Sequence, residues 1–137
     1  MGAIQLAIQS LIHPSDGGKE ETIEQKLDGR LERKGETWIL RYLENAGKQD
    51  QVRTTVKADP AEVAVIRQGM IAYRQTYRPG ERTYSVIETP GGTSEMEVET
   101  IDYLREDGHI RFSFRLHMEN DPVGHYQLDI RWTEVSE

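Results

Sequence analysis

The chain has 137 residues, with 17 basic and 24 acidic side chains and no cysteine. This length suits one domain with its own core, so we expect a single domain over residues 1–137. The net charge of −7 disfavours nucleic acid and anionic membranes as partners, and the lack of cysteine excludes disulfides and thiolate sites.

The beginning of the chain has no basic segment followed by an apolar one, and no apolar run is long enough to cross a membrane. These features predict neither a secretory signal nor a membrane span. A chain without cysteine also fits a reducing compartment. We therefore expect a cytoplasmic protein.

Apolar and polar residues alternate with a period of two along the first half of the chain, which is typical of strands. Gly29 lies inside one such segment and indicates a bulge or bend. Asp59 and Pro60 could start a short helix, but Gly69 follows too soon for a long one. The strands expected here cover residues 3–12, 21–32, 37–44, 51–57 and 62–69, with a turn at residues 33–36.

The same alternation continues through the second half. Residues 70–89 resemble a hairpin whose loop is Arg78–Glu81, and further strands are expected over 94–104, 108–119 and 125–132. The strand over 108–119 has an entirely apolar face and an entirely polar one. The apolar face consists of Ile110, Phe112, Phe114, Leu116 and Met118.

The pattern therefore predicts an all-β fold of eight to ten strands joined by short turns. Short sequential connections favour an antiparallel up-and-down meander. One-sided strands must share a core, and closing the sheet removes its two exposed edges. We expect a β-barrel, and a barrel of this size either fills itself with side chains or holds one small ligand.

Three short patterns are the most specific features of the chain: Tyr-x-Glu at Tyr42 and Glu44, Thr-Thr-x-Lys at Thr54 to Lys57, and Arg-x-Gly at Arg67 and Gly69. With them the sequence resembles an uncharacterised bacterial β-barrel family typified by YwiB, a domain of unknown function. The resemblance covers nearly the whole chain. The family is similar to the calycins, which include lipocalins, so the resemblance implies a meander barrel and assigns no function.

Two charged residues share the parity of inward-facing positions. Glu44 alternates with Trp38, Leu40 and Tyr42, and Arg67 alternates with apolar residues of its own strand. A lone buried charge is costly, so we predict that Glu44 and Arg67 pair. Three interpretations remain open: a structural ion pair in a packed core, two strand-end residues in solvent, or a site where Arg67 holds a ligand's carboxylate or phosphate.

Aromatic residues on inward parities could surround a pocket or simply pack as core. The pocket interpretation depends on the whole set together with Thr54 and Arg67. The candidate ligand-binding residues are Arg67, Glu44, Tyr42, Trp38, Thr54, Tyr84 and Tyr126.

Other chemistry finds little support in the sequence. The four histidines do not have the spacing of a zinc-binding helix, so we predict no metal site and no cofactor. The tyrosines and arginines of residues 73–84 could stack on bases, but the global charge opposes nucleic acid. No nucleophile elbow or P-loop is present, and a pairing with Arg67 argues against Glu44 as a general acid.

The sequence thus favours a cytoplasmic calycin-like barrel that binds a small apolar or amphipathic anionic ligand in its interior. A solid barrel that acts as a protein-interaction or scaffold module is the alternative, and an enzyme is the weaker third hypothesis. The sequence leaves the oligomeric state open.

Overall fold

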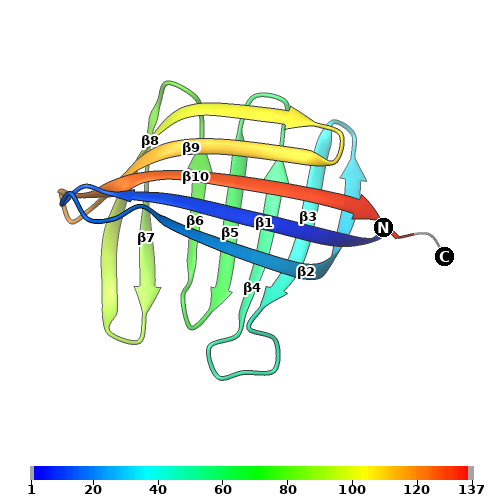
Figure 1. Ribbon diagram of the computed structural model, residues 1–137, viewed down its shortest axis with the longest axis horizontal. Helices are drawn as coiled ribbons and strands as arrows, with labels where there is room; N and C mark the ends of the chain where they lie inside the picture. The colour runs from blue at the N-terminus through cyan, green and yellow to red at the C-terminus, as the bar shows by residue number, and fades with distance from the viewer. Residues whose placement is uncertain (1, 136–137) are drawn as a thin grey trace.

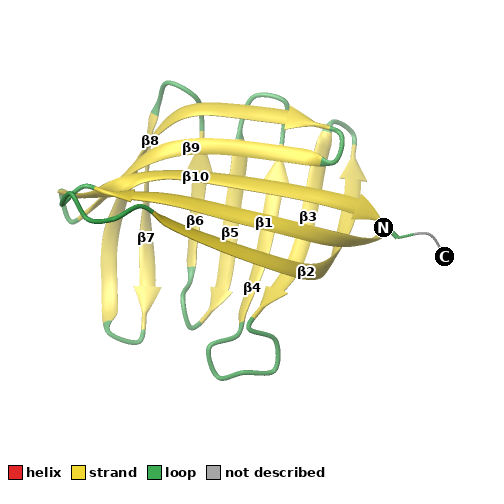
Figure 2. Cartoon of the chain, viewed as in Figure 1, coloured by secondary structure: helices red, strands yellow, loops and turns green. Residues whose placement is uncertain are grey.

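The computed structural model describes residues 2–135, which form ten strands and contain no helix (Figure 2). The strands are β1 (Gly2–Pro14), β2 (Glu21–Lys34), β3 (Thr37–Glu44), β4 (Val52–Ala58), β5 (Val63–Gly69), β6 (Tyr73–Tyr77), β7 (Arg82–Thr89), β8 (Gly92–Glu106), β9 (His109–Met118) and β10 (Asp121–Glu134). The all-β prediction is confirmed, and the strand number lies at the upper end of the expected range. Among the described residues, no helix is present that could cross a membrane.

All ten strands belong to one antiparallel sheet in the order β6-β5-β4-β3-β2-β1-β10-β9-β8-β7. Consecutive strands are neighbours except for β6 and β7, as in an up-and-down meander, and the long ladder between β1 and β10 joins the two halves of the chain. Figure 1 shows β8, β9, β10, β1 and β2 crossing in front of β3 to β7, with the start of β1 beside the end of β10. The sheet therefore curls into a nearly closed barrel.

Tight turns hold the sequential strands in register. The loop between β9 and β10 consists of Glu119 and Asn120 alone, both with positive φ, which is the geometry of a type I′ hairpin turn. Equally short loops follow β2, β7 and β8. Turns of this kind fix the strand register, and hence which side chains face inward.

Gly29 lies where the ladder between β2 and β3 begins. A methyl group added to it would approach the Leu6 Cδ1 atom to 2.6 Å and the Arg41 carbonyl oxygen to 2.8 Å. Glycine therefore lets two neighbouring strands come unusually close at this point. The ladders that pair Gly29 with Ile4 and Tyr42 have no register shift, so the glycine marks this close approach and not a bulge.

One end of the barrel, where the odd-numbered strands begin, is filled with side chains. The rings of Trp38 and Trp132 meet edge to face at 5.9 Å. The Arg105 guanidinium lies 4.0 Å from the centre of the Trp38 ring and donates a 2.8 Å hydrogen bond to the carbonyl of Ala58. Tyr103 adds a 2.7 Å hydrogen bond to the Asp59 carbonyl. These contacts close this end of the barrel with packed and fully paired groups.

The hairpin predicted over residues 70–89 is wrong. Strands β6 and β7 form the two edges of the sheet, and their backbones meet only at an isolated bridge between Ala72 and Glu88. The loop between them bonds to β8 instead, since Gly80 donates to the Thr100 carbonyl and Thr100 donates to the Glu81 carbonyl. The barrel thus has a seam between two strands that are adjacent in sequence.

Candidate ligand-binding site

The opposite end of the barrel, where the odd-numbered strands finish, is hollow. A cavity of about 550 Å³ lies inside it, a volume within the range of small-molecule sites. Its wall is mostly apolar and receives side chains from all ten strands. The apolar part of the wall includes Ile8, Ile12, Phe114, Leu116, Met118 and Leu128.

The predicted ion pair is confirmed and lies in the wall of this cavity. The Arg67 Nη2 atom lies 2.7 Å from the Glu44 Oε2 atom, and the Thr54 hydroxyl donates a 3.1 Å hydrogen bond to Glu44 Oε1. Register explains the meeting, because Thr54 pairs with Arg67 on β5 and lies diagonally across from Glu44 on β3. The two charged side chains are 21% and 17% exposed, so water screens them only in part.

Arg67 is incompletely paired. Its Nε atom is buried and has no hydrogen-bond partner among the described residues. Burial opposes the charge of Arg67, but Tyr73, Glu44 and Tyr42 outweigh this effect and raise the pKa of the guanidinium. The Tyr73 ring lies 5.8 Å from the guanidinium carbon. Arg67 is therefore a fixed positive charge with spare hydrogen-bonding capacity.

Four tyrosines add polar groups to a largely apolar wall. Burial raises the pKa of Tyr42, Tyr73, Tyr77 and Tyr126, so these phenols keep their protons across the physiological range. They offer the cavity hydroxyl donors that remain neutral. A few polar groups among apolar ones are what orient a ligand in such a site.

The structure places four further predicted residues as follows. Tyr42, Thr54 and Tyr126 line the cavity, as the ligand-binding hypothesis required. Trp38 faces inward but lies at the packed end beside Trp132 and is not part of the cavity wall. Its assignment as a ligand contact is wrong, because parity shows which face a residue occupies and not how far along the barrel it lies.

Tyr84 is the second incorrect assignment. Its side chain points outward and the residue is 70% exposed. Its strand neighbours Thr83 and Ser85 face the interior instead, where they bond to Gln75. Tyr84 was selected because it is aromatic and has the expected parity. The hydrogen bonds of Thr83 and Ser85 to Gln75 turn those two side chains inward, so Tyr84 between them points outward.

Comparison with protein families decides the classification. A family model described as a domain of unknown function, DUF1934, matches residues 7–130. The chain belongs to the DUF1934 family. No curated protein matches the sequence.

A solved structure shares the fold of this DUF1934 chain. It is the crystal structure of the YwiB protein from Bacillus subtilis, with a TM-score of 0.77 and 23% sequence identity. The match covers 96% of this chain and 92% of YwiB. The family resemblance expected from the sequence is confirmed, and the likeness to YwiB establishes the barrel architecture.

Sequence reasoning did not single out Gln75, although it organises the seam of the DUF1934 barrel. Its side chain is fully buried, donates a 2.7 Å hydrogen bond to the Thr83 hydroxyl, and accepts a 2.6 Å hydrogen bond from Ser85. The Thr83 hydroxyl in turn bonds to the Thr76 carbonyl. The available signal was an amide on the inward parity between Tyr73 and Tyr77.

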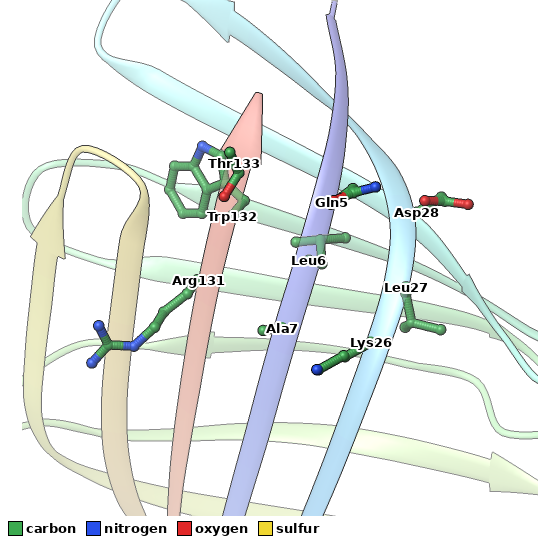
Figure 3. A pocket seen from close by; sticks show the side chains of 9 residues that line it. All are labelled: Gln5, Leu6, Ala7, Lys26, Leu27, Asp28, Arg131, Trp132 and Thr133. Atoms are coloured by element: carbon green, nitrogen blue, oxygen red, sulfur yellow. The ribbon is translucent and has the colours of Figure 1, made fainter. Parts of the chain in front are cut away.

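A second depression, of about 470 Å³, lies on the outer face over β2, β1 and β10. Figure 3 shows Lys26 and Arg131 on either side of the small Ala7 side chain, with which both pair in register. Arg131 already contacts Asp129 at 3.1 Å. This surface lacks the enclosure and the apolar wall of the interior cavity, so the interior is the better candidate site in the DUF1934 barrel.

Within residues 2–135, no cluster of three or more metal-type ligands is present. His109 contacts Asp129 at 3.1 Å on the outer side of the sheet, and Arg131 contacts the same carboxylate at 3.1 Å. The candidate site of this DUF1934 protein is therefore described by its cavity and its internal ion pair.

Proposed function

We propose that the protein binds a small amphipathic anion inside the barrel, as a cytoplasmic binding protein in the manner of the calycins. The apolar body of the ligand would lie against Phe114, Leu116 and Met118, and its anionic head would contact Arg67. The tyrosine hydroxyls would supply additional hydrogen bonds to the head. The ligand would reach the cavity from the end of the barrel where β3 and β5 finish.

One observation carries this proposal: the Arg67 guanidinium lies in the wall of a cavity large enough for a small molecule, and Nη2 alone of its nitrogen atoms contacts Glu44. A guanidinium has five N–H donors in a planar fork, so it can also bind a ligand's carboxylate or phosphate oxygen. The apolar wall supplies the remaining affinity by removing the ligand's apolar surface from water.

The alternative of a solid barrel that serves as an interaction module depended on a filled interior. The described residues fill only the end of the barrel that contains Trp38 and Trp132. An enzyme is also less well supported, because Glu44 is already engaged by Arg67 and Thr54. Binding is therefore the function that best fits the geometry.

The direct test is native mass spectrometry of the protein purified from its host, with a fluorescent naphthalene sulfonate as a probe of the purified protein. Ser10 lines the cavity, and Ser10→Trp should fill it and abolish probe binding. Gln9→Trp places the same side chain on the exposed outer face and serves as the matched control. Equal probe binding by both variants would contradict an interior site.

A further inference from the structure

We infer that Glu44 is a specificity-determining residue, which makes the barrel take up a proton together with an anionic ligand and so favours weak acids. This inference rests on the proposed function, since it concerns the same cavity. It starts from the fact that Arg67 is not a free cation. Glu44 already neutralises it through the 2.7 Å contact.

The charges of the cavity wall sum to zero before a ligand arrives. Among the described residues that line the cavity, Glu44 and Arg67 are the only charged ones. A carboxylate ligand that reaches Arg67 would therefore leave two negative charges beside one positive charge. This excess charge would lie in a largely apolar enclosure, where water screens it poorly.

Two carboxylates that share one site do not both stay ionised at modest cost. A proton bound between them restores neutrality and adds a hydrogen bond, and it then belongs to the pair rather than to either group. The ligand oxygen and a Glu44 oxygen can each accept from the guanidinium while the proton bridges them. Arg67 offers several N–H donors, of which Nη2 alone is used in the contact with Glu44.

The other groups around Glu44 cannot supply the missing positive charge. From its own strand β3 comes the neutral phenol of Tyr42, and from β6 comes that of Tyr73. From β4 comes the Thr54 hydroxyl. On the β2 side, Gln25 contributes a neutral amide to the same cavity wall. The compensating proton must therefore come from solvent.

Ligands that bring no charge should behave differently. An alcohol or an ester with the same apolar body adds no negative charge, so it should bind without proton uptake. A weak acid can bind with its own proton or with one on Glu44, and the two descriptions are thermodynamically the same. The cavity thus distinguishes ligands by the protons that accompany them, and a carboxylic acid is the class that meets this condition at least cost.

The test is titration calorimetry of octanoate and of octanol in buffers with different ionisation enthalpies, which measures the protons exchanged on binding. For the natural sequence, octanoate should be bound with proton uptake, and its affinity should fall by up to roughly tenfold per pH unit as the pH rises. Octanol should be bound with no proton exchange and no such pH dependence.

Three variants make the result specific. Glu44→Gln should abolish the proton uptake and tighten octanoate binding by about tenfold, because Arg67 then lacks a counter-ion. The double variant Glu44→Gln with Arg67→Gln keeps the cavity uncharged, and it should bind octanol as the natural sequence does but octanoate more weakly, because the carboxyl group then lacks the guanidinium contact. Glu32→Gln is the control, because it removes an ion pair on the outer face, in which Glu32 Oε1 lies 2.9 Å from Arg41 Nη1. Its octanoate affinity and proton uptake should equal those of the natural sequence.

The outcomes separate the two proposals. Octanoate binding that Ser10→Trp blocks but that takes up no proton would overturn the role of Glu44 and leave the interior site standing. Proton uptake that persists in Glu44→Gln would overturn it equally. Failure of both octanoate and octanol to bind would overturn the interior site and this inference together.

Discussion

Ser85 on β7 donates a 2.6 Å hydrogen bond to the Gln75 side chain on β6, so an amide stands where a backbone ladder would otherwise close the barrel. The same amide donates to the Thr83 hydroxyl at 2.7 Å. Apart from this amide, the seam is joined by the Thr83 hydroxyl, which donates to the Thr76 carbonyl, and by an isolated bridge between Ala72 and Glu88. The integrity of the seam therefore depends largely on one buried polar side chain.

We expect Gln75→Leu to lower the free energy of unfolding by about 2–3 kcal/mol, because Ser85 and Thr83 lose their partner in a buried position. Urea unfolding measures the loss, and hydrogen exchange should show β6 and β7 opening before the other strands. Gln68→Leu, at an exposed position on β5, is the control. Equal stability of the two variants would show that the amide network does not hold the seam.

The close approach at Gly29 gives a second expectation. Gly29→Ala should destabilise the fold by about 1–3 kcal/mol, because the new methyl group meets the Leu6 side chain and the Arg41 carbonyl oxygen. Gly91→Ala adds the same group where the nearest atom is 3.7 Å away. Thermal unfolding of the two variants should differ clearly, and similar melting temperatures would contradict the steric argument.

The internal ion pair can be tested through stability alone. Arg67→Leu leaves the Glu44 carboxylate partly buried without its cation, and we expect a loss of about 1–3 kcal/mol, below the range for fully buried pairs because water reaches both groups. Adding Glu44→Leu should restore most of the loss. Arg41→Leu breaks the more exposed pair with Glu32 and should cost less than about 1 kcal/mol. A double variant as unstable as Arg67→Leu would argue against pairing.

Burial of the tyrosines predicts an alkaline limit to stability. Burial raises the pKa of Tyr103 to about 12 from its ordinary value of 10.0. The folded protein therefore holds this proton more tightly than the unfolded chain. Its contribution to stability is complete below about pH 10 and is lost as the pH rises towards about 12. Tyr42, Tyr73 and Tyr77 shift in the same direction.

Urea unfolding between about pH 9 and about pH 12, together with tyrosinate absorbance, measures this dependence. Tyr103→Phe should reduce the alkaline loss of stability. At neutral pH it should cost about 1 kcal/mol, because the hydrogen bond to the Asp59 carbonyl disappears. If the free energy of unfolding of this variant fell with pH as steeply as that of the natural sequence, Tyr103 would not contribute to the alkaline loss of stability.

Alternation along the strands sufficed to predict the barrel and the meeting of Glu44 with Arg67. Each strand has a regular register around these residues, so side-chain parity translates directly into orientation. The apolar face of β9 is inward for the same reason, as the complete burial of Ile110 and Phe112 shows. Local pattern is informative wherever a strand has a neighbour on each side.

Alternation did not predict the place of a side chain along the barrel axis. It also did not predict the orientation of β7, which has no backbone ladder with β6. Trp38 has the expected parity, yet the packing of Trp132 and Arg105 against it places it at the filled end. Tyr84 points outward because Thr83 and Ser85 satisfy the buried amide of Gln75. Both outcomes depend on partners from other strands, which no single segment encodes.

The uninterrupted ladder between the first and last strands has a further consequence. Val135 donates a 3.0 Å hydrogen bond to the Ala3 carbonyl, so the polypeptide leaves the cylinder beside the point where it enters. A circular permutant that links these neighbours through a short flexible segment and opens the chain between Pro79 and Gly80 would keep every backbone ladder. In such a molecule the new chain ends would lie at the seam, with β7 as the first strand and β6 as the last.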